Sequence, residues 1–408
     1  MGTRATGKAS KGRIVVTGMI AQYPLGGVAW DYVQYPVGLA RLGYDVFYLE
    51  NTGRWPYNPT EGGVVADLST SAVSSASEFN TRYLQDVMRR FGLGERWACK
   101  FPWQDEWFGP VAARRAEILA SADLMINVSG ALAPLDTDCR QVKRLAYVDS
   151  DPVFTQVKLA RGQNDFAAFV DSHDVHFSFG EALSASPTPE TGHTWLPTRQ
   201  PVLIDEWSTT EPAGDTFTTI MNWTSYKPVK HAGTTYGQKD VELSRFLELP
   251  RLVAPIELEL AINAGKTRRT PRELLVHRGW KLADPLVACA DLDAYRAYVQ
   301  GSKAEWSVAK HGYVAGRSGW FSCRSACYLA AGRPAVVQDT GFGDVLPVGH
   351  GVVAFSTPEE AAASVRDVND RYGEHAAAAR EIAREYFDAG TVLSRLVELA
   401  LASRTVPA

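Results

Sequence analysis

Two loops of the sequence combine glycines with polar residues in a pattern that could bind an anion. Residues 18–27 and residues 339–343 (DTGFG) each follow a short apolar run that is typical of a buried strand. The first loop ends with Gly26 and Gly27, which begin an apolar pattern of helical spacing. Free backbone N–H groups at the start of a helix favour phosphate. Two such loops in corresponding places of two halves predict a cleft with anion-binding walls.

Motifs that would identify a more specific nucleotide chemistry are incomplete. Residues 341–343 (GFG) begin a dinucleotide fingerprint, but Leu346 stands where the third glycine is required. Residues 265–267 (GKT) resemble the end of a phosphate-binding P-loop, but Leu260 stands in place of its first glycine. The sequence therefore predicts neither a hydride-transferring dehydrogenase nor a P-loop enzyme.

Helical and strand patterns alternate along the chain, which indicates mostly parallel sheets covered by helices. Strands are expected at residues 14–16, 46–49, 124–128, 144–148, 175–179, 216–222, 256–262, 302–307 and 335–338. Segment 184–212 is rich in Pro, Thr and Ser and interrupts the alternation, so we expect it to join two domains. Helices are expected at residues 316–331 and, separated by Gly390, at residues 373–388 and 391–403.

Length and composition limit the class of protein. The 408 residues suffice for two or three domains, and 45% of them are hydrophobic. A net charge of −4 gives no electrostatic footprint for nucleic acid or an anionic membrane. Five cysteines without a CxxC pair favour a reducing compartment, and no apolar run approaches the roughly 18 residues of a membrane span. The sequence therefore predicts a cytoplasmic α/β protein without nucleic-acid or membrane partners.

Two stretches resemble the GT-B glycosyltransferases, in particular the nucleotide-sugar transferases related to glycosyltransferase family 4. Residues 26–50 (GGVAWDYVQYPVGLARLGYDVFYLE) are similar to the family's N-terminal glycine pair, amphipathic helix and strand. Residues 317–344 (RSGWFSCRSACYLAAGRPAVVQDTGFGD) are similar to its donor-site helix, turn, strand and glycine loop. The resemblance implies two Rossmann-like domains facing a cleft, at residues 12–195 and 196–388. It also implies a C-terminal helix, within residues 389–408, that crosses back to the first domain.

In this family the acceptor lies mainly on the first domain and the donor nucleotide on the second. Family members often carry two glutamates eight positions apart on the donor helix, but Gly319 and Cys327 stand at those places here. Donor binding is therefore expected to use other groups. The candidates are Gly26, Gly27, Lys310, Arg317, Ser318, Arg324, Ser325, Asp339, Thr340 and Gly341. The lysines that could stabilise the diphosphate are Lys227, Lys230, Lys239 and Lys310. In the family a basic residue after the first strand of the second domain often contacts the diphosphate, which favours Lys227.

Glycosyl transfer requires stabilisation of the leaving diphosphate and, if the anomeric centre is inverted, a base for the acceptor hydroxyl. Asp31, near the start of the first helix, and Asp149, after the strand at 144–148, are the candidate catalytic residues. A structural role for Asp31, as a favourable charge near the helix N-terminus, is the alternative and is the more favoured of the two. Retention of configuration would need no such base, and the sequence does not decide between the two. Asp149 and Asp151 have the spacing of a metal-binding pair but belong to the acceptor-side domain. We therefore expect metal-independent transfer without a cofactor.

The segment FPWQDEWFGP supplies Trp103 and Trp107, whose flat faces could stack on an acceptor, although a buried hydrophobic cluster would explain them equally. His173 and His176 are expected to have ordinary partners rather than a metal. The resemblance implies transfer of a sugar from a nucleotide-sugar donor to a hydroxyl of a small molecule or saccharide. A nucleotide-sugar 2-epimerase of the same fold and a non-catalytic nucleotide-sugar binding protein are the alternatives.

Overall fold

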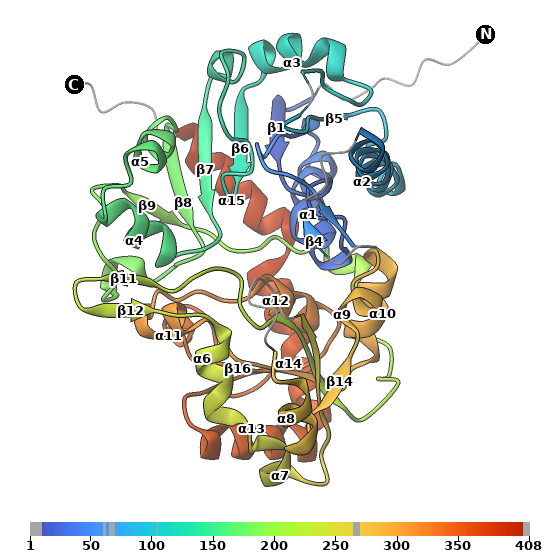
Figure 1. The fold of residues 1–408 in the computed structure, drawn as a ribbon, viewed down its shortest axis with the longest axis vertical. Coiled ribbons are helices and arrows are strands. Elements are labelled where there is room, and N and C mark those ends of the chain that lie inside the picture. The colour runs from blue at the N-terminus through green and yellow to red at the C-terminus, as the bar shows by residue number, and fades with distance from the viewer. Residues whose placement is uncertain (1–9, 60–62, 65–69, 104, 264–269, 403–408) are drawn as a thin grey trace.

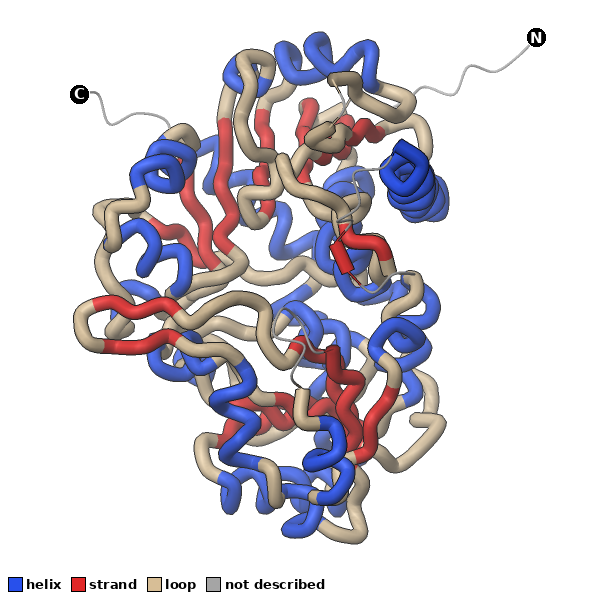
Figure 2. The backbone as a smooth tube through the Cα atoms, viewed as in Figure 1, coloured by secondary structure: helices blue, strands red, loops and turns tan. Residues whose placement is uncertain are grey.

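The computed structural model describes residues 10–59, 63–64, 70–103, 105–263 and 270–402. These residues form two lobes, each built on a parallel β-sheet that is covered by helices (Figures 1 and 2). The sheet of the first lobe has the strand order β5-β2-β1-β6-β7-β8-β9, and all of its paired strands run parallel. Its strands are β1 (Arg13–Thr17), β2 (Asp45–Glu50), β5 (Trp97–Cys99), β6 (Leu124–Val128), β7 (Leu145–Asp149), β8 (Val175–Ser178) and β9 (Trp195–Pro197).

The sheet of the second lobe has the order β14-β13-β10-β15-β16-β17 and is also parallel throughout. Its strands are β10 (Phe217–Asn222), β13 (Leu258–Asn263), β14 (Lys281–Ala283), β15 (Ala304–Ser307), β16 (Ala335–Gln338) and β17 (Val352–Phe355). Two short antiparallel pairs lie outside the sheets: β3 (Tyr57–Asn58) with β4 (Gly63–Val64), and β11 (Val229–His231) with β12 (Thr234–Tyr236). The predicted alternation of strands and helices is thus confirmed.

The helices divide between the two lobes. Those of the first are α1 (Gly26–Arg41), α2 (Thr70–Arg90), α3 (Arg115–Ser121), α4 (Phe154–Ala160), α5 (Asn164–Asp171) and α15 (Ala389–Ala402). Those of the second are α6 (Lys239–Leu243), α7 (Leu249–Val253), α8 (Arg272–His277), α9 (Pro285–Ala288), α10 (Leu292–Gly301), α11 (His311–Gly316), α12 (Cys323–Ala330), α13 (Pro358–Asp370) and α14 (Tyr372–Ile382). Every residue of β6 and β7 is buried, as expected for strands covered on both faces.

The C-terminal helix α15 lies behind the first sheet, against α1 (Figure 1). The close approach depends on Gly38 of α1, because a side chain there would collide with Leu393 and Ala389 of α15. The chain enters this helix beside the segment that leaves the first lobe. Val202 donates its N–H to the Phe387 carbonyl and accepts from the Ala389 N–H. The two connections between the lobes therefore run side by side.

The lobes contact each other on both sides of the crevice. On one side, the indole of Trp30 in α1 donates to the Leu292 carbonyl at 2.9 Å, and the Gly26 N–H donates to the Cys289 carbonyl at 2.8 Å. On the other side, the hairpin β11–β12 extends towards α4 (Figure 1), and Phe154 of α4 packs against Tyr226 and Tyr313 of the second lobe. The two lobes are thus held together around the crevice.

Two predicted helix boundaries are wrong. The helix expected at residues 316–331 begins only at Cys323, because Arg317 and Gly319 both adopt positive φ angles, of 42° and 80°, which end α11 and start a turn. The C-terminal helices are separated at Asp388 rather than at Gly390, since Asp388 accepts the Thr391 N–H at 3.0 Å and so caps α15.

Candidate functional site

A cavity of about 330 Å³, which we call the crevice cavity, lies in the crevice between the two lobes. The start of α1 forms one wall, and the carboxyl ends of β10 and β13 with residues of α9 to α12 form the other. Ligands of parallel α/β sheets bind at this edge of the strands. The polar and charged side chains that border the cavity are Asp31, Asn222, Ser225, Lys239, Asn263, Tyr295, Lys310, Tyr313, Ser322 and Arg324. Four of the sequence-predicted site residues, Gly27, Asp31, Lys310 and Arg324, therefore lie together here.

Three cationic side chains border this cavity, and their partners differ. Lys310 forms an ion pair with Asp151 at 2.8 Å, and Arg324 forms one with Glu305 at 2.6 Å. Among the described residues, none forms a hydrogen bond or ion pair with the ammonium group of Lys239. Burial, and next the charge of Arg324, hold the pKa of Lys239 well below its usual range. Lys239 is therefore the cation of this crevice that most lacks a counter-charge.

Lys227 and Lys239 were both candidates for contact with the diphosphate, and Lys227 was the favoured one. Lys227 is exposed in the loop before β11 and does not border the crevice cavity. The hairpin β11–β12 carries the chain away from the end of β10, and Lys239 begins α6 directly after the hairpin. Position along the sequence therefore favoured a lysine that does not border this cavity.

The two predicted catalytic carboxylates have different surroundings. Burial raises the pKa of Asp31 to about 7, although the nearby charge of Arg324 acts in the opposite direction. Asp149 is 1% exposed, and its carboxylate accepts hydrogen bonds from Thr155, Gln156, Ser178 and the Asp151 N–H. These partners all belong to the first lobe and fix the turn between β7 and α4. Asp31 is thus the carboxylate that borders the crevice, and Asp149 supports the loop beside it.

Several backbone N–H groups of the loop at residues 18–27 already have acceptors within the protein, which the prediction of free groups did not anticipate. Glu50, at the end of β2, accepts the N–H groups of Ala21 and Gln22 at 2.9 and 2.5 Å, and burial raises its pKa to about 7. The Gly26 N–H donates to the Cys289 carbonyl. A Cβ atom at Gly26 would lie 1.9 Å from the Asp291 carbonyl oxygen, and one at Gly27 would meet the Tyr295 ring. The glycine pair therefore permits contact between the lobes, and Gly27 alone of the two borders the cavity.

The loop at residues 339–343 is likewise closed by internal contacts. Asp339 accepts the Gly341 N–H at 2.8 Å and pairs with Arg317 at 2.8 Å. Gly341 has a φ of 86°, and a Cβ atom there would lie 2.8 Å from the Arg317 carbonyl oxygen. Thr340 donates its hydroxyl to the Trp320 carbonyl. These residues hold the turn before α12 in place, and none of Arg317, Asp339, Thr340 and Gly341 borders the crevice cavity.

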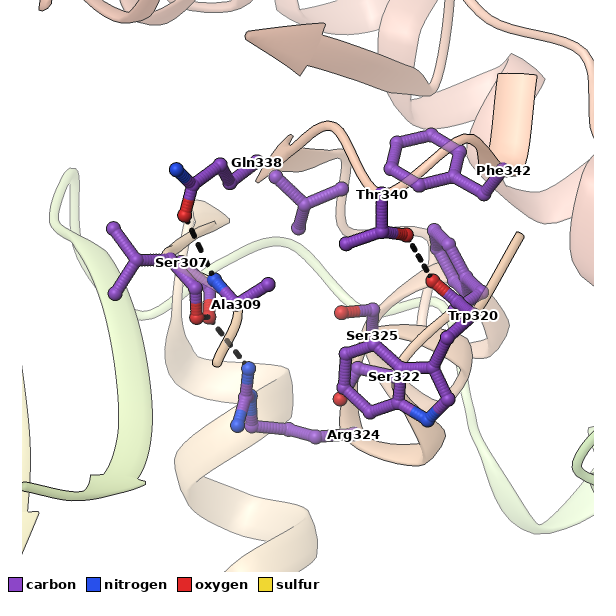
Figure 3. A pocket seen from close by; sticks show the side chains of 12 residues that line it. Ser307, Ala309, Trp320, Ser322, Arg324, Ser325, Gln338, Thr340 and Phe342 are labelled. Atoms are coloured by element: carbon purple, nitrogen blue, oxygen red, sulfur yellow. Dashed lines mark hydrogen bonds between the residues drawn. The ribbon is translucent and has the colours of Figure 1, made fainter. Parts of the chain in front are cut away.

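A second, small cavity of about 20 Å³ lies between this loop and α12, with room for one water molecule (Figure 3). Ser325 borders it, and its buried hydroxyl has no hydrogen-bond partner among the described residues. The hydroxyl of Ser318 is also buried and also without such a partner, but Ser318 does not line the cavity. Of the two predicted serines, only Ser325 is placed to contact a small polar group.

The tryptophans predicted to bind an acceptor border neither of these cavities. Trp103 stacks between Trp55 and Phe101, with ring centroids 4.7 and 5.1 Å apart. The Trp107 ring packs under the guanidinium of Arg115 at 4.8 Å. These surroundings fit the alternative interpretation of the two tryptophans, that they belong to hydrophobic clusters.

A cavity of about 690 Å³ opens in the first lobe at the carboxyl ends of β6 and β7. Its lining combines hydroxyl groups, aromatic rings and charged groups: Thr52, Arg54, Ser129, Tyr147, Asp149, Ser150, Asp151, Lys158, Asp165, Phe166, Phe169 and Tyr226. Tyr226 comes from the second lobe, so this cavity reaches the boundary between the lobes. We refer to it as the first-lobe cavity.

The two predicted histidines have ordinary partners. His173 bonds to Asn127 and to carbonyl groups of α5, and burial lowers its pKa to about 4. In the described ranges, no three or more His, Cys, Asp and Glu side chains form a cluster suited to a metal ion, and this includes the surroundings of His173 and His176. Over the same ranges, no helix has the length and apolar character needed to cross a bilayer.

A comparison with models of protein families finds no match for this chain, and a comparison with curated proteins finds none either. Solved structures with a similar fold include glycosyltransferases. AviGT4, a glycosyltransferase involved in avilamycin A biosynthesis, is 14% identical, with 96% of this chain and 99% of AviGT4 covered at a TM-score of 0.54. Anabaena Alr3699/HepE in complex with UDP-glucose is 12% identical, with 96% and 100% covered at a TM-score of 0.57.

An alpha-glucosyltransferase in complex with UDP-glucose and DNA containing an abasic site is 11% identical to this chain. The match covers 95% of this chain and 99% of that protein at a TM-score of 0.57. All three likenesses extend over both lobes, because they cover nearly the whole chain. The predicted fold class is thereby confirmed: this chain has the two-lobed GT-B fold of these glycosyltransferases.

Proposed function

We propose that this protein is a glycosyltransferase that moves a sugar from a nucleotide-sugar donor to a hydroxyl group of an acceptor. The observation that carries the proposal is the side-chain nitrogen of Lys239 in the crevice cavity, which has no hydrogen-bond or ion-pair partner among the described residues, with Arg324 and Lys310 on the same walls. A nucleoside diphosphate supplies the negative charge that these cations need. The solved structures of this fold with UDP-glucose support the same proposal.

The chemistry follows from where charge develops. As the bond between the anomeric carbon and the diphosphate oxygen breaks, negative charge grows on the leaving diphosphate. Preorganised cations at that point lower the barrier, because they need no reorganisation during the reaction. We assign this task to Lys239 and Arg324. Since these side chains supply the positive charge, the proposed reaction needs no metal ion, and addition of a chelator should leave the rate unchanged.

We assign the acceptor to the first-lobe cavity, which has hydroxyl groups and aromatic rings on its walls. Aromatic faces next to polar groups suit a saccharide or another hydroxylated small molecule. The net charge of −4 supports such an acceptor over a nucleic acid. Asp31, with a pKa of about 7, can take the proton of the acceptor hydroxyl if the reaction inverts the anomeric centre.

We also propose a cytoplasmic location. All five cysteines of the sequence are free thiols, and four of them are buried. Free cysteines are typical of a reducing compartment.

Thermal unfolding in the presence of nucleotides tests the proposal. A panel of nucleoside diphosphates and nucleotide sugars should contain members that raise the unfolding temperature, since a ligand at a hundred times its Kd stabilises by about 2.7 kcal/mol. The variant Lys239→Met should abolish most of that shift, and Lys227→Met, which removes an exposed lysine nearby, should preserve it. No shift with any nucleotide, or loss of the shift in Lys227→Met alone, would contradict the assignment.

A further inference from the structure

One partly buried ion pair joins the two lobes and borders both cavities. Asp151 follows β7 in the first lobe, and Lys310 precedes α11 in the second. The Lys310 Nζ lies 2.8 Å from Oδ1 of Asp151. Tyr226 donates its hydroxyl to Oδ2 at 2.6 Å, and Tyr313 donates its hydroxyl to Oδ1. The carboxylate of a first-lobe residue is therefore bound by three groups of the second lobe.

The two members of this pair border different cavities. Lys310 lines the crevice cavity and does not line the first-lobe cavity. Asp151 lines the first-lobe cavity and does not line the crevice cavity. A ligand in one cavity that competes for its member of the pair must therefore change the charge presented to the other cavity.

We propose that this pair couples the donor site to the acceptor site: the donor diphosphate draws Lys310 from Asp151, and the freed carboxylate accepts a hydrogen bond from the acceptor hydroxyl. Asp151 is then a positioning residue for the acceptor, engaged only after the donor has bound. The proposal rests on the proposed function, because it requires an anionic donor in the crevice cavity. It adds to that function a role for Asp151 at the acceptor and an order in which the donor binds before the acceptor.

The surroundings of Lys310 allow its ammonium to move without losing all favourable contacts. It lies over the rings of Phe154, Tyr226 and Tyr313, 5.2, 4.6 and 5.1 Å from their centroids. Cation–π attraction depends little on small displacements across a ring face. The ammonium can therefore turn towards a diphosphate in the crevice while the three rings still surround it.

The carboxylate of Asp151 keeps two of its hydrogen-bond donors after Lys310 has moved. Burial acts to raise its pKa, but Lys310 and the hydroxyl groups of Tyr226 and Tyr313 together hold the pKa below the usual range. Two of these three donors remain when Lys310 is drawn away. An ionised carboxylate can only accept hydrogen bonds, so the group it selects in the first-lobe cavity is a donor such as a sugar hydroxyl.

A double-mutant cycle tests the coupling. Isothermal titration calorimetry with UDP, GDP, ADP and dTDP first identifies the nucleotide that binds the wild-type protein most tightly. Asp151→Asn removes the competitor for Lys310 and should tighten binding of that nucleotide about fivefold, the factor expected for a partly exposed ion pair. Lys310→Met should weaken binding, and Asp151→Asn should have no effect in the Lys310→Met background. Glu181→Gln, which breaks an ion pair with Arg199 that lines neither cavity, is the control and should leave binding unchanged.

A kinetic measurement separates positioning from structure. With water as the acceptor, hydrolysis of the nucleotide sugar of the same base should show a lower KM and a lower kcat in Asp151→Asn. A merely structural role would lower stability without this split. If Asp151→Asn does not fold, Tyr313→Phe tests the same coupling. This variant removes one hydrogen-bond donor from Asp151, so Asp151 should hold Lys310 more strongly. Nucleotide binding should then weaken about twofold, again only when Lys310 is present.

The outcomes distinguish the two proposals. Nucleotide binding that is unchanged or weaker in Asp151→Asn, or an Asp151 effect that persists without Lys310, overturns the coupling and leaves the proposed function intact. An unchanged kcat of hydrolysis overturns the role of Asp151 at the acceptor. Failure of all four nucleotides to bind overturns the proposed function and the coupling together.

Discussion

Glu305 is fully buried on β15, and its Oε1 lies 2.6 Å from Nε of Arg324 on α12. The same guanidinium donates to the Ile220 carbonyl and to the Ser307 hydroxyl, at 2.7 and 2.6 Å. Arg324 thus neutralises a buried carboxylate on one side and borders the crevice cavity on the other. A bound diphosphate would share this cation with Glu305 rather than claim it alone.

Removal of Arg324 should therefore lower stability strongly. In Arg324→Met the carboxylate of Glu305 stays buried without its cation, and we expect the free energy of unfolding to fall by about 3–5 kcal/mol. The double variant Arg324→Met/Glu305→Gln should recover most of this loss, because neither charge is then buried. Urea unfolding followed by circular dichroism measures both. A double variant as unstable as the single one would show that packing of Arg324, not its charge, matters.

Nucleotide binding should be accompanied by uptake of a proton at Lys239. Burial and the charge of Arg324 favour the neutral amine in the free protein, and a diphosphate favours the ammonium. Affinity should therefore fall as the pH rises. Calorimetry at pH 8.5 in two buffers of different ionisation enthalpy measures the proton directly, and Lys239→Met should show no uptake. Release of a proton by the wild-type protein would contradict this assignment.

The sequence predicts much of the sheet architecture, for a physical reason. The apolar runs of β6 and β16 have both faces buried, so their composition alone marks them as strands between breaks in the chain. The helix α1 is also predictable, since Gly26 and Gly43 bound an apolar face of helical spacing. Local patterns suffice where local composition decides the structure.

The site is less predictable, because it depends on contacts between distant segments. Lys239 enters the crevice only because the hairpin β11–β12 carries residues 227–235 away from it. Glu305 looks like one more strand residue in the sequence, and its role appears only when α12 brings Arg324 against it. The N–H groups of the loop before α1 are free in the sequence pattern, but Glu50 and Cys289, from other elements, accept them in the fold.

The ionisation of Asp31 should make stability depend on pH. Its pKa of about 7 in the folded protein exceeds the usual value, so the native state holds a proton that the unfolded chain has lost. Stability from this group is present at low pH and is lost as the pH rises through 7. Asp31→Asn, which cannot ionise, should therefore gain about 4 kcal/mol over the wild type at pH 8 and only about 1 kcal/mol at pH 4.5. Urea midpoints at the two pH values measure the difference, and an equal gain at both would exclude the ionisation as its cause.

Substitution of Asp149 by Asn should change stability in the opposite direction from the same substitution at Asp31. Each oxygen of its carboxylate accepts two hydrogen bonds, so Asp149→Asn replaces one acceptor by an NH₂ group that faces donors. We expect a loss of about 1–3 kcal/mol in unfolding free energy. Urea unfolding at pH 7 beside Asp31→Asn gives a direct comparison of the two carboxylates. A variant as stable as the wild type would show that the turn between β7 and α4 does not need this carboxylate.

The contact between α1 and the second lobe should depend on the absence of a side chain at Gly26. A Cβ atom there would lie 1.9 Å from the backbone carbonyl oxygen of Asp291, which cannot move away as a flexible side chain could. Gly26→Ala should therefore force α1 and α10 apart, lower the free energy of unfolding by about 1–3 kcal/mol and weaken nucleotide binding in the crevice. Urea unfolding and calorimetry with the same nucleotide measure the two effects.

Gly373→Ala is the matched control for this substitution. Gly373 lies in α14, and a Cβ atom there would have no atom of the described residues within 4 Å beyond its own stretch of helix. Alanine at this position should therefore add up to about 1 kcal/mol of stability through helix propensity alone and leave nucleotide binding unchanged. Should Gly26→Ala unfold at the same urea concentration as the wild type and bind nucleotide equally well, the lobes cannot be held together at the contact between Gly26 and Asp291.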